Sequence, residues 1–398
     1  MTMGGSVIHH GPAALLDAYA PGETTLISSP GGATLAHGEG MRVPPAAGRD
    51  QLRSLAVRAQ ETLSEAVHEG LPPVLVGALP FHPSVAPHLV VPRHVTNGPP
   101  LRAWPGESVA SVLEDLPSRH PVPEPREFAN RVARAVSMLR AGDGLDKVVL
   151  ARALELRGAE PDIPALLARL AAADPSAHVF AIDLPTTSDA PRTLVGASPE
   201  TLLRRMGDTV ESLPLAGSAR RAADPVEDAR RGAALLCSAK DREEHAVVTR
   251  AIADALTPLC SALDIPDSPE LVRTRAMWHL ATRIRGRLAD RSITSLDLAT
   301  ALHPTPAVCG TPRERARQAI TELEPIDRGY YAGAVGWQEI TGDGEWIVAI
   351  RCGEIEGDTV RLWAGAGLVQ GSDPDGELAE TTAKFGTLLS AIGLESAQ

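Results

Sequence analysis

Apolar residues recur at helical spacing in several parts of the chain. Between residues 126 and 144 they return every three or four positions, and Gly142 marks the end of the run. The last such segment has a proline at its start and a glycine at its end, as is common for helices. We expect helices over 52–70, 126–144, 225–259 and from Pro374 to Gly393.

Short apolar runs between these helices are typical of buried strands. Gly207 and Asp208 mark a hairpin between two of the runs. Strands mostly follow strands through short turns, which favours antiparallel sheets with helices outside them, an α+β class. The expected strands are 72–81, 147–156, 178–184, 192–198, 333–340, 345–357 and 359–369.

Two segments are predicted to be irregular. Residues 1–50 are rich in glycine, proline and alanine, so we expect at most a first strand or two there. The segment 98–124 contains "GPP" and "LPSRHPVPEP" and few apolar residues, which makes it the expected linker.

Composition excludes several classes of protein. The chain has 398 residues, 43% of them hydrophobic, and a net charge of −12. No overall basic field exists to attract nucleic acid or an anionic membrane. The start lacks a signal peptide pattern, and no apolar run is long enough to span a membrane. The four cysteines have no metal-binding spacing and are expected to be reduced, so we expect a soluble cytoplasmic protein.

Two pairs of acids stand at helical spacing. Asp241 and Glu244 form the first pair, and Glu377 and Glu380 form the second, just after Pro374. Residues three apart share a helix face, so each pair projects together. A solvated helix face is the commoner explanation for any single pair. Oxygen ligands from two helices, some acting through water, would also suit magnesium.

The stretch "GAGLVQG" before the last helix resembles a dinucleotide-binding fingerprint. That motif needs a further strand with an acidic residue about 20 positions on. No such strand is expected after the last helix. We therefore expect the glycines to let backbone amides approach an anionic group.

Nine ordered motifs resemble the chorismate-utilising enzymes, and most closely the isochorismate synthases. They cover roughly 125–390, with a weaker match over 72–95. The resemblance implies one large α+β domain of two packed antiparallel sheets with helices outside, like anthranilate synthase component I. Residues 1–120 would be a weakly matched N-terminal part, and 121–398 the chorismate-binding catalytic region. The motifs are "DKVVLARALEL", "LVGASPETLLRR", "SLPLAGSARR", "DREEHAVV", "MWHLATRIRG", "LHPTPAVCGTPRERA", "YYAGAVGW", "WIVAIRCGEI" and "WAGAGLVQGSDPDGELAETTAKF".

The resemblance also implies roles for residues of these motifs. Lys147 would be the general base and Glu200 the general acid. Without the motifs, Lys147 could be a strand-end lysine that reaches water, and Glu200 an exposed turn residue. Glu244 and Glu380 would bind Mg²⁺ directly, and Asp241 and Glu377 through water. The implied substrate-binding residues are Gly217, Ser218, His279, Ala307, Tyr331, Arg351, Gly365, Gly367 and Lys384.

Three positions favour the isochorismate synthases over related enzymes. Ala216 stands where one type of aminodeoxychorismate synthase carries a lysine nucleophile. Ala307 stands where anthranilate and salicylate synthases usually carry threonine, and Ser218 is also typical of the isochorismate group. Cys309 departs from the commoner glycine or serine. A salicylate synthase and a non-catalytic chorismate-binding relative are the alternatives.

The implied reaction is the Mg²⁺-dependent isomerisation of chorismate to isochorismate. Water adds at C2 of the ring, and the C4 hydroxyl leaves. The product would feed siderophore or menaquinone synthesis. We expect a monomer that works without an amidotransferase subunit, nucleic acid or membrane.

Overall fold

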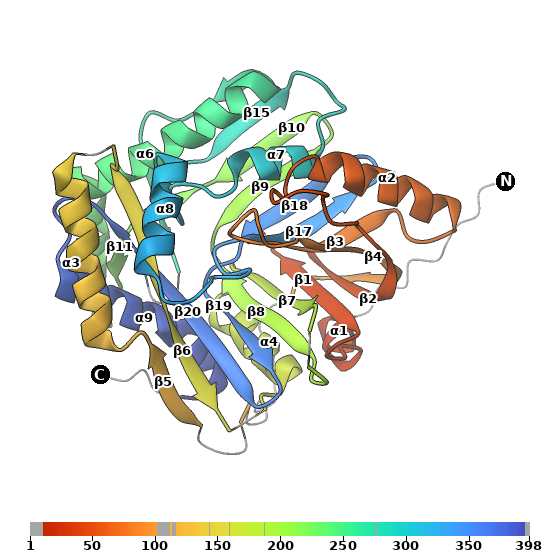
Figure 1. Ribbon diagram of the computed structural model, residues 1–398, viewed down its shortest axis with the longest axis horizontal. Helices are drawn as coiled ribbons and strands as arrows, with labels where there is room; N and C mark the ends of the chain where they lie inside the picture. Colours follow the sequence, from red (N-terminus) through yellow and green to blue (C-terminus); the bar gives the residue numbers. More distant parts are fainter. Residues whose placement is uncertain are drawn as a thin grey trace.

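The structure is a computed structural model that describes residues 11–101, 112–113, 117–142, 144–158, 160–186, 188–274 and 277–394 (Figure 1). Helices and strands alternate irregularly along the chain. The α-helices within these ranges are α1 (Pro12–Asp17), α2 (Leu55–His68), α3 (Pro125–Ala141), α4 (Ile163–Ala173), α5 (Pro225–Cys237), α6 (Ala239–Leu256), α7 (Ser295–Leu302), α8 (Arg313–Leu323) and α9 (Pro374–Ile392).

The strands begin near the N-terminus and continue to the last helix. They are β1 (Thr24–Ser29), β2 (Gly32–Arg42), β3 (Val74–Leu79), β4 (His88–Gly98), β5 (Ser118–Val122), β6 (Lys147–Arg157), β7 (His178–Leu184), β8 (Arg192–Ser198), β9 (Thr201–Met206), β10 (Thr209–Leu213), β11 (Leu215–Arg220), β12 (Cys260–Asp264), β13 (Glu270–Arg273), β14 (Met277–Ala281), β15 (Ile284–Leu288), β16 (Gly310–Thr311), β17 (Ala334–Glu339), β18 (Gly344–Val348), β19 (Cys352–Glu356) and β20 (Thr359–Leu368).

The strands form two antiparallel sheets of unequal size. Seventeen described strands are joined by hydrogen bonds into one sheet, and β11, β14 and β13 form a separate sheet of three. Within the large sheet β6 pairs with β20 along its whole length. The N-terminal strands belong to the same sheet, since β3 pairs with β17 and β1 with β7. The α+β class with antiparallel sheets and outer helices is confirmed.

Two hydrophobic clusters hold the helices against the sheets. One contains residues of α2, α3, α6, α7 and α8, with Trp346 and Phe180 completely buried. The other lies where α1, α4 and α9 pack on the large sheet. Figure 1 shows α3 at one side of the molecule and α9 behind β6 and β20. The helices α5 and α6 cover the small sheet.

Most predicted elements are present, and some predictions need correction. The expected strand 345–357 is two strands, β18 and β19, which are separated at 349–351, where Arg351 has a left-handed φ of 50°. The two strands expected within 1–50 are β1 and β2, and the helix α1 there was not predicted. The helical segment 225–259 is two helices, α5 and α6, because Ser238 interrupts it and caps α6 through its hydroxyl. The expected linker 98–124 contains the strand β5, which pairs with β6. The proline content of this segment wrongly suggested a linker without strands, because an edge strand tolerates a proline such as Pro121. The remainder of that prediction, over 102–111 and 114–116, lies outside the described residues.

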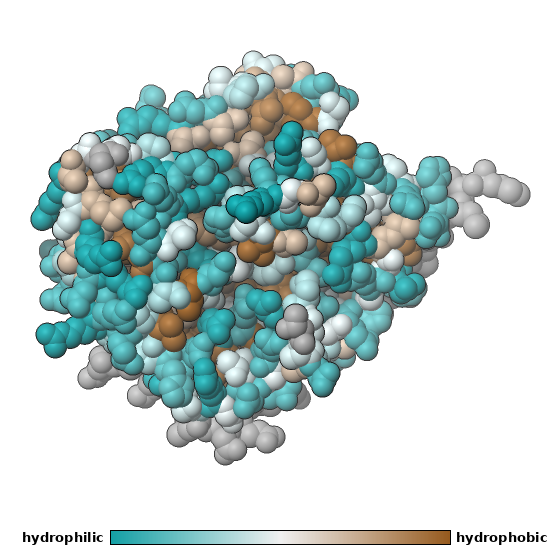
Figure 2. Space-filling model, viewed as in Figure 1, coloured by the Kyte–Doolittle hydropathy of each residue, from teal (hydrophilic) through white to brown (hydrophobic). Residues whose placement is uncertain are grey.

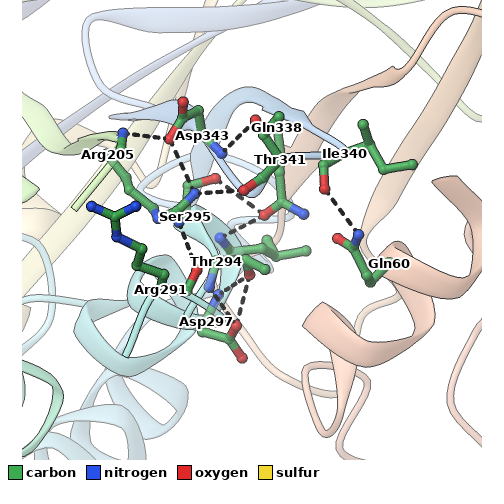
Figure 3. A network of polar contacts seen from close by, with 12 residues as sticks. Gln60, Arg205, Arg291, Thr294, Ser295, Asp297, Gln338, Ile340, Thr341 and Asp343 are labelled. Atoms are coloured by element: carbon green, nitrogen blue, oxygen red, sulfur yellow. Dashed lines mark hydrogen bonds and ion pairs between the residues drawn. The ribbon is translucent and has the colours of Figure 1, made fainter. Parts of the chain in front are cut away.

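A polar network fixes α7 to the β17–β18 hairpin (Figure 3). The Gln338 side-chain oxygen accepts hydrogen bonds from the Ser295 hydroxyl at 3.1 Å and the Leu296 amide at 2.9 Å. Arg205, which is buried, donates to the carbonyl of Thr341 and to Asp343. These hydrogen bonds join α7, β9 and the hairpin inside the fold, so we assign the network a structural role. Gln338 Nε2 and Arg205 Nε are buried without a partner among the described residues.

The face shown in Figure 2 is mostly hydrophilic, with hydrophobic residues in small scattered patches. Over the described part of the chain, no helix combines the length and the apolar character needed to cross a membrane.

Candidate active site

One cavity gathers the residues predicted for the site. It lies between the N-terminal ends of α6 and α9, the strands β11 and β20, and the loop before β16. Lys147 is the one predicted residue that is not part of its lining. The predicted residues that line it are Glu200, Gly217, Ser218, Asp241, Glu244, His279, Ala307, Tyr331, Arg351, Gly365, Gly367, Glu377, Glu380 and Lys384.

The starts of two helices bring the acid pairs to the cavity. Asp373 caps α9 by accepting a hydrogen bond from the Gly376 amide at 2.8 Å, with Pro374 in the first turn. Ser238 caps α6 in the same manner. Glu377 and Glu380 therefore reach the cavity from the first turns of α9. The acid pairs line one cavity and do not form two unrelated solvated faces.

Two of these acids are paired with lysines. Lys147 Nζ lies 2.8 Å from Glu244 Oε1, and Lys384 Nζ lies 2.5 Å from Glu380 Oε1. Lys384 also donates to the Gly365 carbonyl at 2.8 Å. The sequence did not foresee that the predicted base and a predicted metal ligand would form one ion pair.

The two acids of α9 have pKa values that are shifted in opposite directions. Burial raises the pKa of Glu377 to about 7, and the Glu380 carboxylate adds to the rise. Burial also acts on Glu380, but the Lys384 ammonium outweighs it and lowers the pKa of Glu380. No group of three or more His, Cys, Asp or Glu side chains within the described residues is arranged to hold a metal ion. The donor set still fits a hard cation, since all four groups are carboxyl groups, and a cation would offset the mutual repulsion of Glu377 and Glu380.

Lys147 lies at the start of β6 and is only 2% exposed. It is covered by Gly367 of β20. A side chain at position 367 would place its Cβ 3.1 Å from Lys147 Cε and 2.8 Å from Glu244 Oε1. Glycine at this position leaves room for the lysine and the glutamate to meet without displacement of either side chain.

Glu200 lies in the turn between β8 and β9 and is 3% exposed. Burial raises the pKa of its carboxyl to about 7, although a backbone hydrogen bond from Leu215 and the charge of Lys147 oppose the rise. Glu200 is buried, so the alternative of an exposed turn residue is wrong, and its role as the general acid stays a prediction. A group with this pKa is available as a proton donor near neutral pH.

His279 belongs to the small sheet, where it pairs with Ser218 of β11. Its ring bonds to the backbone of Gly217, and its buried Nε2 has no partner within the described chain. Burial, with Arg351 and Lys384 nearby, lowers the pKa of His279 to about 3. A neutral ring with a free nitrogen at a cavity wall is suited to a polar ligand.

Tyr331, just before β17, and Arg351, just after β18, reach the cavity from the same end of this antiparallel strand pair. The Tyr331 ring stacks on Trp363 with centroids 5.2 Å apart. A side chain at Gly365 would lie 2.9 Å from the Tyr331 hydroxyl, so this glycine also makes room for a neighbour. Arg351 adopts a left-handed φ of 50°, an uncommon conformation for a bulky residue. Their predicted role in binding a carboxylate stays a prediction.

The model of the chorismate binding enzyme family matches residues 107–393. The chain belongs to this family. DhbC from Bacillus subtilis, an isochorismate synthase, is 47% identical over 385 residues, which is 96% of each chain. The crystal structure of DhbC from Bacillus anthracis has a TM-score of 0.90 and 41% identity, and the match covers 96% of this chain and 100% of that chain.

The same fold is present in a solved structure of lower sequence identity. Anthranilate synthase component I from Streptococcus pneumoniae has a TM-score of 0.69 at 21% identity, over 94% of this chain and 91% of that chain. This likeness concerns the fold alone. It confirms the predicted anthranilate synthase component I-like architecture.

Sequence reasoning missed one cation of this cavity. Lys240, next to Asp241 on α6, lines the cavity. The signal was in the composition, because only three of the 38 lysine and arginine residues are lysines. Lys147, Lys240 and Lys384 all lie at this site. Lysine, unlike arginine, can lose its proton when buried.

Two of the positions that distinguish related enzymes lie in the wall of the cavity. Ala216 and Ala307 both line the cavity, so a lysine or a threonine there would face the ligand. Cys309 is buried, and its Sγ lies 3.7 Å from the Arg313 carbonyl. It does not belong to the cavity lining, so its departure from the family pattern does not change the wall directly.

Proposed function

We propose that the chain is an isochorismate synthase that converts chorismate to isochorismate. The observation that carries the proposal is that buried Glu200 lines the same cavity as Glu244, the ion-pair partner of buried Lys147. Lys147 at the start of β6 and Glu200 in the β8–β9 turn would offer a base and an acid to one ligand. The relationship to DhbC supports this assignment, and Ala216 and Ala307 disfavour amine transfer and lyase chemistry.

In this reaction one water adds to the ring of the substrate, and the hydroxyl at another ring carbon leaves as a second water. Lys147, in its neutral form, takes a proton from the water that attacks C2 of the ring. Glu200 gives its proton to the C4 hydroxyl, which leaves as water while the ring double bonds shift. Arg351 and Tyr331 hold the enolpyruvyl carboxylate, since a guanidinium suits bidentate binding of a carboxylate.

Mg²⁺ belongs to this proposal. Glu244 and Glu380 would hold the ion directly, and Asp241 and Glu377 would do so through water. When bound, the ion supplies positive charge for the ring carboxylate of the substrate. Carboxylate oxygens from two helix starts provide the hard ligands that magnesium prefers.

The chain is proposed to act as a monomer in the cytoplasm, without an amidotransferase. The nucleophile is water, so no subunit is needed to supply ammonia. All four cysteines are free thiols, as in a reducing compartment.

The deciding experiment is product analysis by chromatography after incubation with chorismate and Mg²⁺. Isochorismate is the expected product. Accumulation of salicylate and pyruvate would identify a salicylate synthase instead. Binding of chorismate without any turnover would identify a non-catalytic relative.

Replacing Glu380 by Gln is expected to raise the Mg²⁺ concentration for half-maximal activity by about 10–100-fold, a typical cost of disturbing a metal site. The amide keeps the shape of the side chain but removes its negative charge. Glu243→Gln is the control, because Glu243 is exposed on α6 and does not line the cavity. Unchanged metal dependence in Glu380→Gln would remove this residue from the metal site, and full turnover in excess chelator would exclude the metal requirement.

A further inference from the structure

A second and larger cavity of about 1270 Å³ lies behind α9. Its walls come from α4, α9, β5, β6 and the small sheet, on the side of α9 that faces away from the acid pairs. In Figure 1, α9 lies behind β6 and β20, and α4, which contacts α9, packs against β7 and β8. Much of the wall is apolar, with contributions from Leu154, Leu170, Met277, Leu378 and Phe385. A concave space that is lined largely by apolar side chains, with a few polar groups, is typical of a small-molecule site.

The charged residues around this cavity are mostly positive, whereas the net charge of the whole chain is negative. The chain carries a net charge of −12, yet the charged residues that line the cavity within the described ranges are mainly arginines. Two aspartates, Asp174 and Asp375, also take part. The arginines are Arg119, Arg152, Arg169, Arg220 and Arg351. A local positive field in an acidic protein favours an anionic ligand.

Arg152 is the buried member of this group, with 4% exposure. Its guanidinium lies over the rings of Phe128 and Phe385, at 5.5 and 5.1 Å from their centroids. Nε donates to the Thr381 hydroxyl at 2.9 Å, and Nη2 donates to the Thr382 hydroxyl at 2.6 Å. All of these contacts are to neutral groups.

A buried cation needs a counter-charge, and Arg152 has none among the described residues. Leaving water without forming an ion pair costs free energy. Burial accordingly lowers the pKa of Arg152 to about 10, which still leaves it charged at neutral pH. An apolar side chain would fill the same space between the rings without that cost.

We propose that this second cavity binds a small aromatic carboxylate, whose carboxylate group pairs with Arg152. The ligand would supply the missing negative charge, and its ring would lie against the apolar wall of α4 and α9. A planar guanidinium at the wall is suited to bidentate binding of a carboxylate. This site is separate from the chorismate site and does not depend on the proposed function.

The two cavities share one helix and two wall residues. Pro199 and Arg351 line both of them. Glu377, Glu380 and Lys384 face the first cavity from α9, and Leu378, Thr382 and Phe385 face the second from the same helix. A test must therefore distinguish binding behind α9 from binding in the chorismate site.

The experiment measures the binding of benzoate by isothermal titration calorimetry, with benzamide as the uncharged probe of the same shape. Benzoate is expected to bind at one saturable site and benzamide at least about 10-fold more weakly, because a hydrogen bond to a charged group is lost. Arg152→Met should weaken benzoate binding by about 10–100-fold. Circular dichroism and the melting temperature of Arg152→Met report whether it is folded.

Ala173→Phe tests the site without touching Arg152. Ala173, at the end of α4, lines the second cavity, and a phenyl ring there would occupy the ligand space. This variant should also lose benzoate binding. Equal benzoate affinity in wild type and Ala173→Phe would overturn the proposal, as would equal binding of benzamide. Complete displacement of benzoate by chorismate in the inactive Lys147→Ala variant would place benzoate in the chorismate site and would likewise overturn it.

Discussion

Replacing Lys147 by alanine is expected to lower kcat for isochorismate formation by about 10²–10⁴-fold, the usual contribution of general base catalysis. Lys147 Nζ is the basic group at this end of the cavity, held by Glu244 at 2.8 Å and shielded from solvent. Without it, the attacking water has no group to take its proton. Binding of chorismate should survive, because Arg351, Tyr331 and Lys384 remain.

Lys147→Arg separates charge from basicity. The guanidinium keeps the positive charge and can pair with Glu244, but it does not give up its proton in a protein. This variant should be as inactive as Lys147→Ala. Steady-state kinetics give kcat, and calorimetry with chorismate gives the binding constant. Normal turnover by Lys147→Arg would show that Lys147 acts through its charge and not as a base.

Much of the candidate site could be predicted from local sequence signals. The spacing of Glu377 and Glu380 after a first-turn proline fixed the face of one helix, and Asp241 and Glu244 did the same for another. Such spacing cannot say that two helices start at the same cavity, because that depends on how they pack. The ordered family motifs supplied this information.

Contacts between distant residues could not be predicted in the same way. The ion pair of Lys147 with Glu244 joins residues almost a hundred positions apart, and its distance depends on β6, β20 and α6 together. The glycine motif was correctly separated from a dinucleotide site. The structure adds a steric reason for Gly367, which makes room for the lysine and the acid. The predicted approach of backbone amides to an anionic group stays a prediction.

The pH dependence of stability should report on Glu200. Its pKa is about 7 in the folded protein, compared with 4.5 for an unperturbed glutamate. The folded state therefore binds more protons than the unfolded state between these values, so this group makes the protein less stable as pH rises from about 4.5 to 7. Glu200→Gln should show a smaller loss of unfolding free energy over that interval in urea titrations. An identical pH dependence in both proteins would show that Glu200 is not protonated in the fold.

Glu200→Gln is expected to lower kcat by about 10²–10⁴-fold in both directions of the reaction. In the forward direction the amide cannot protonate the departing C4 hydroxyl. In the reverse direction, by microscopic reversibility, it cannot accept the proton from the water that attacks C4. Chorismate should still bind, since the amide fills the same volume as the carboxyl group. Glu345→Gln is the matched control, because Glu345 is also a buried carboxyl but lies outside the cavity lining. If Glu200→Gln converts isochorismate to chorismate at the wild-type rate, another group must accept that proton.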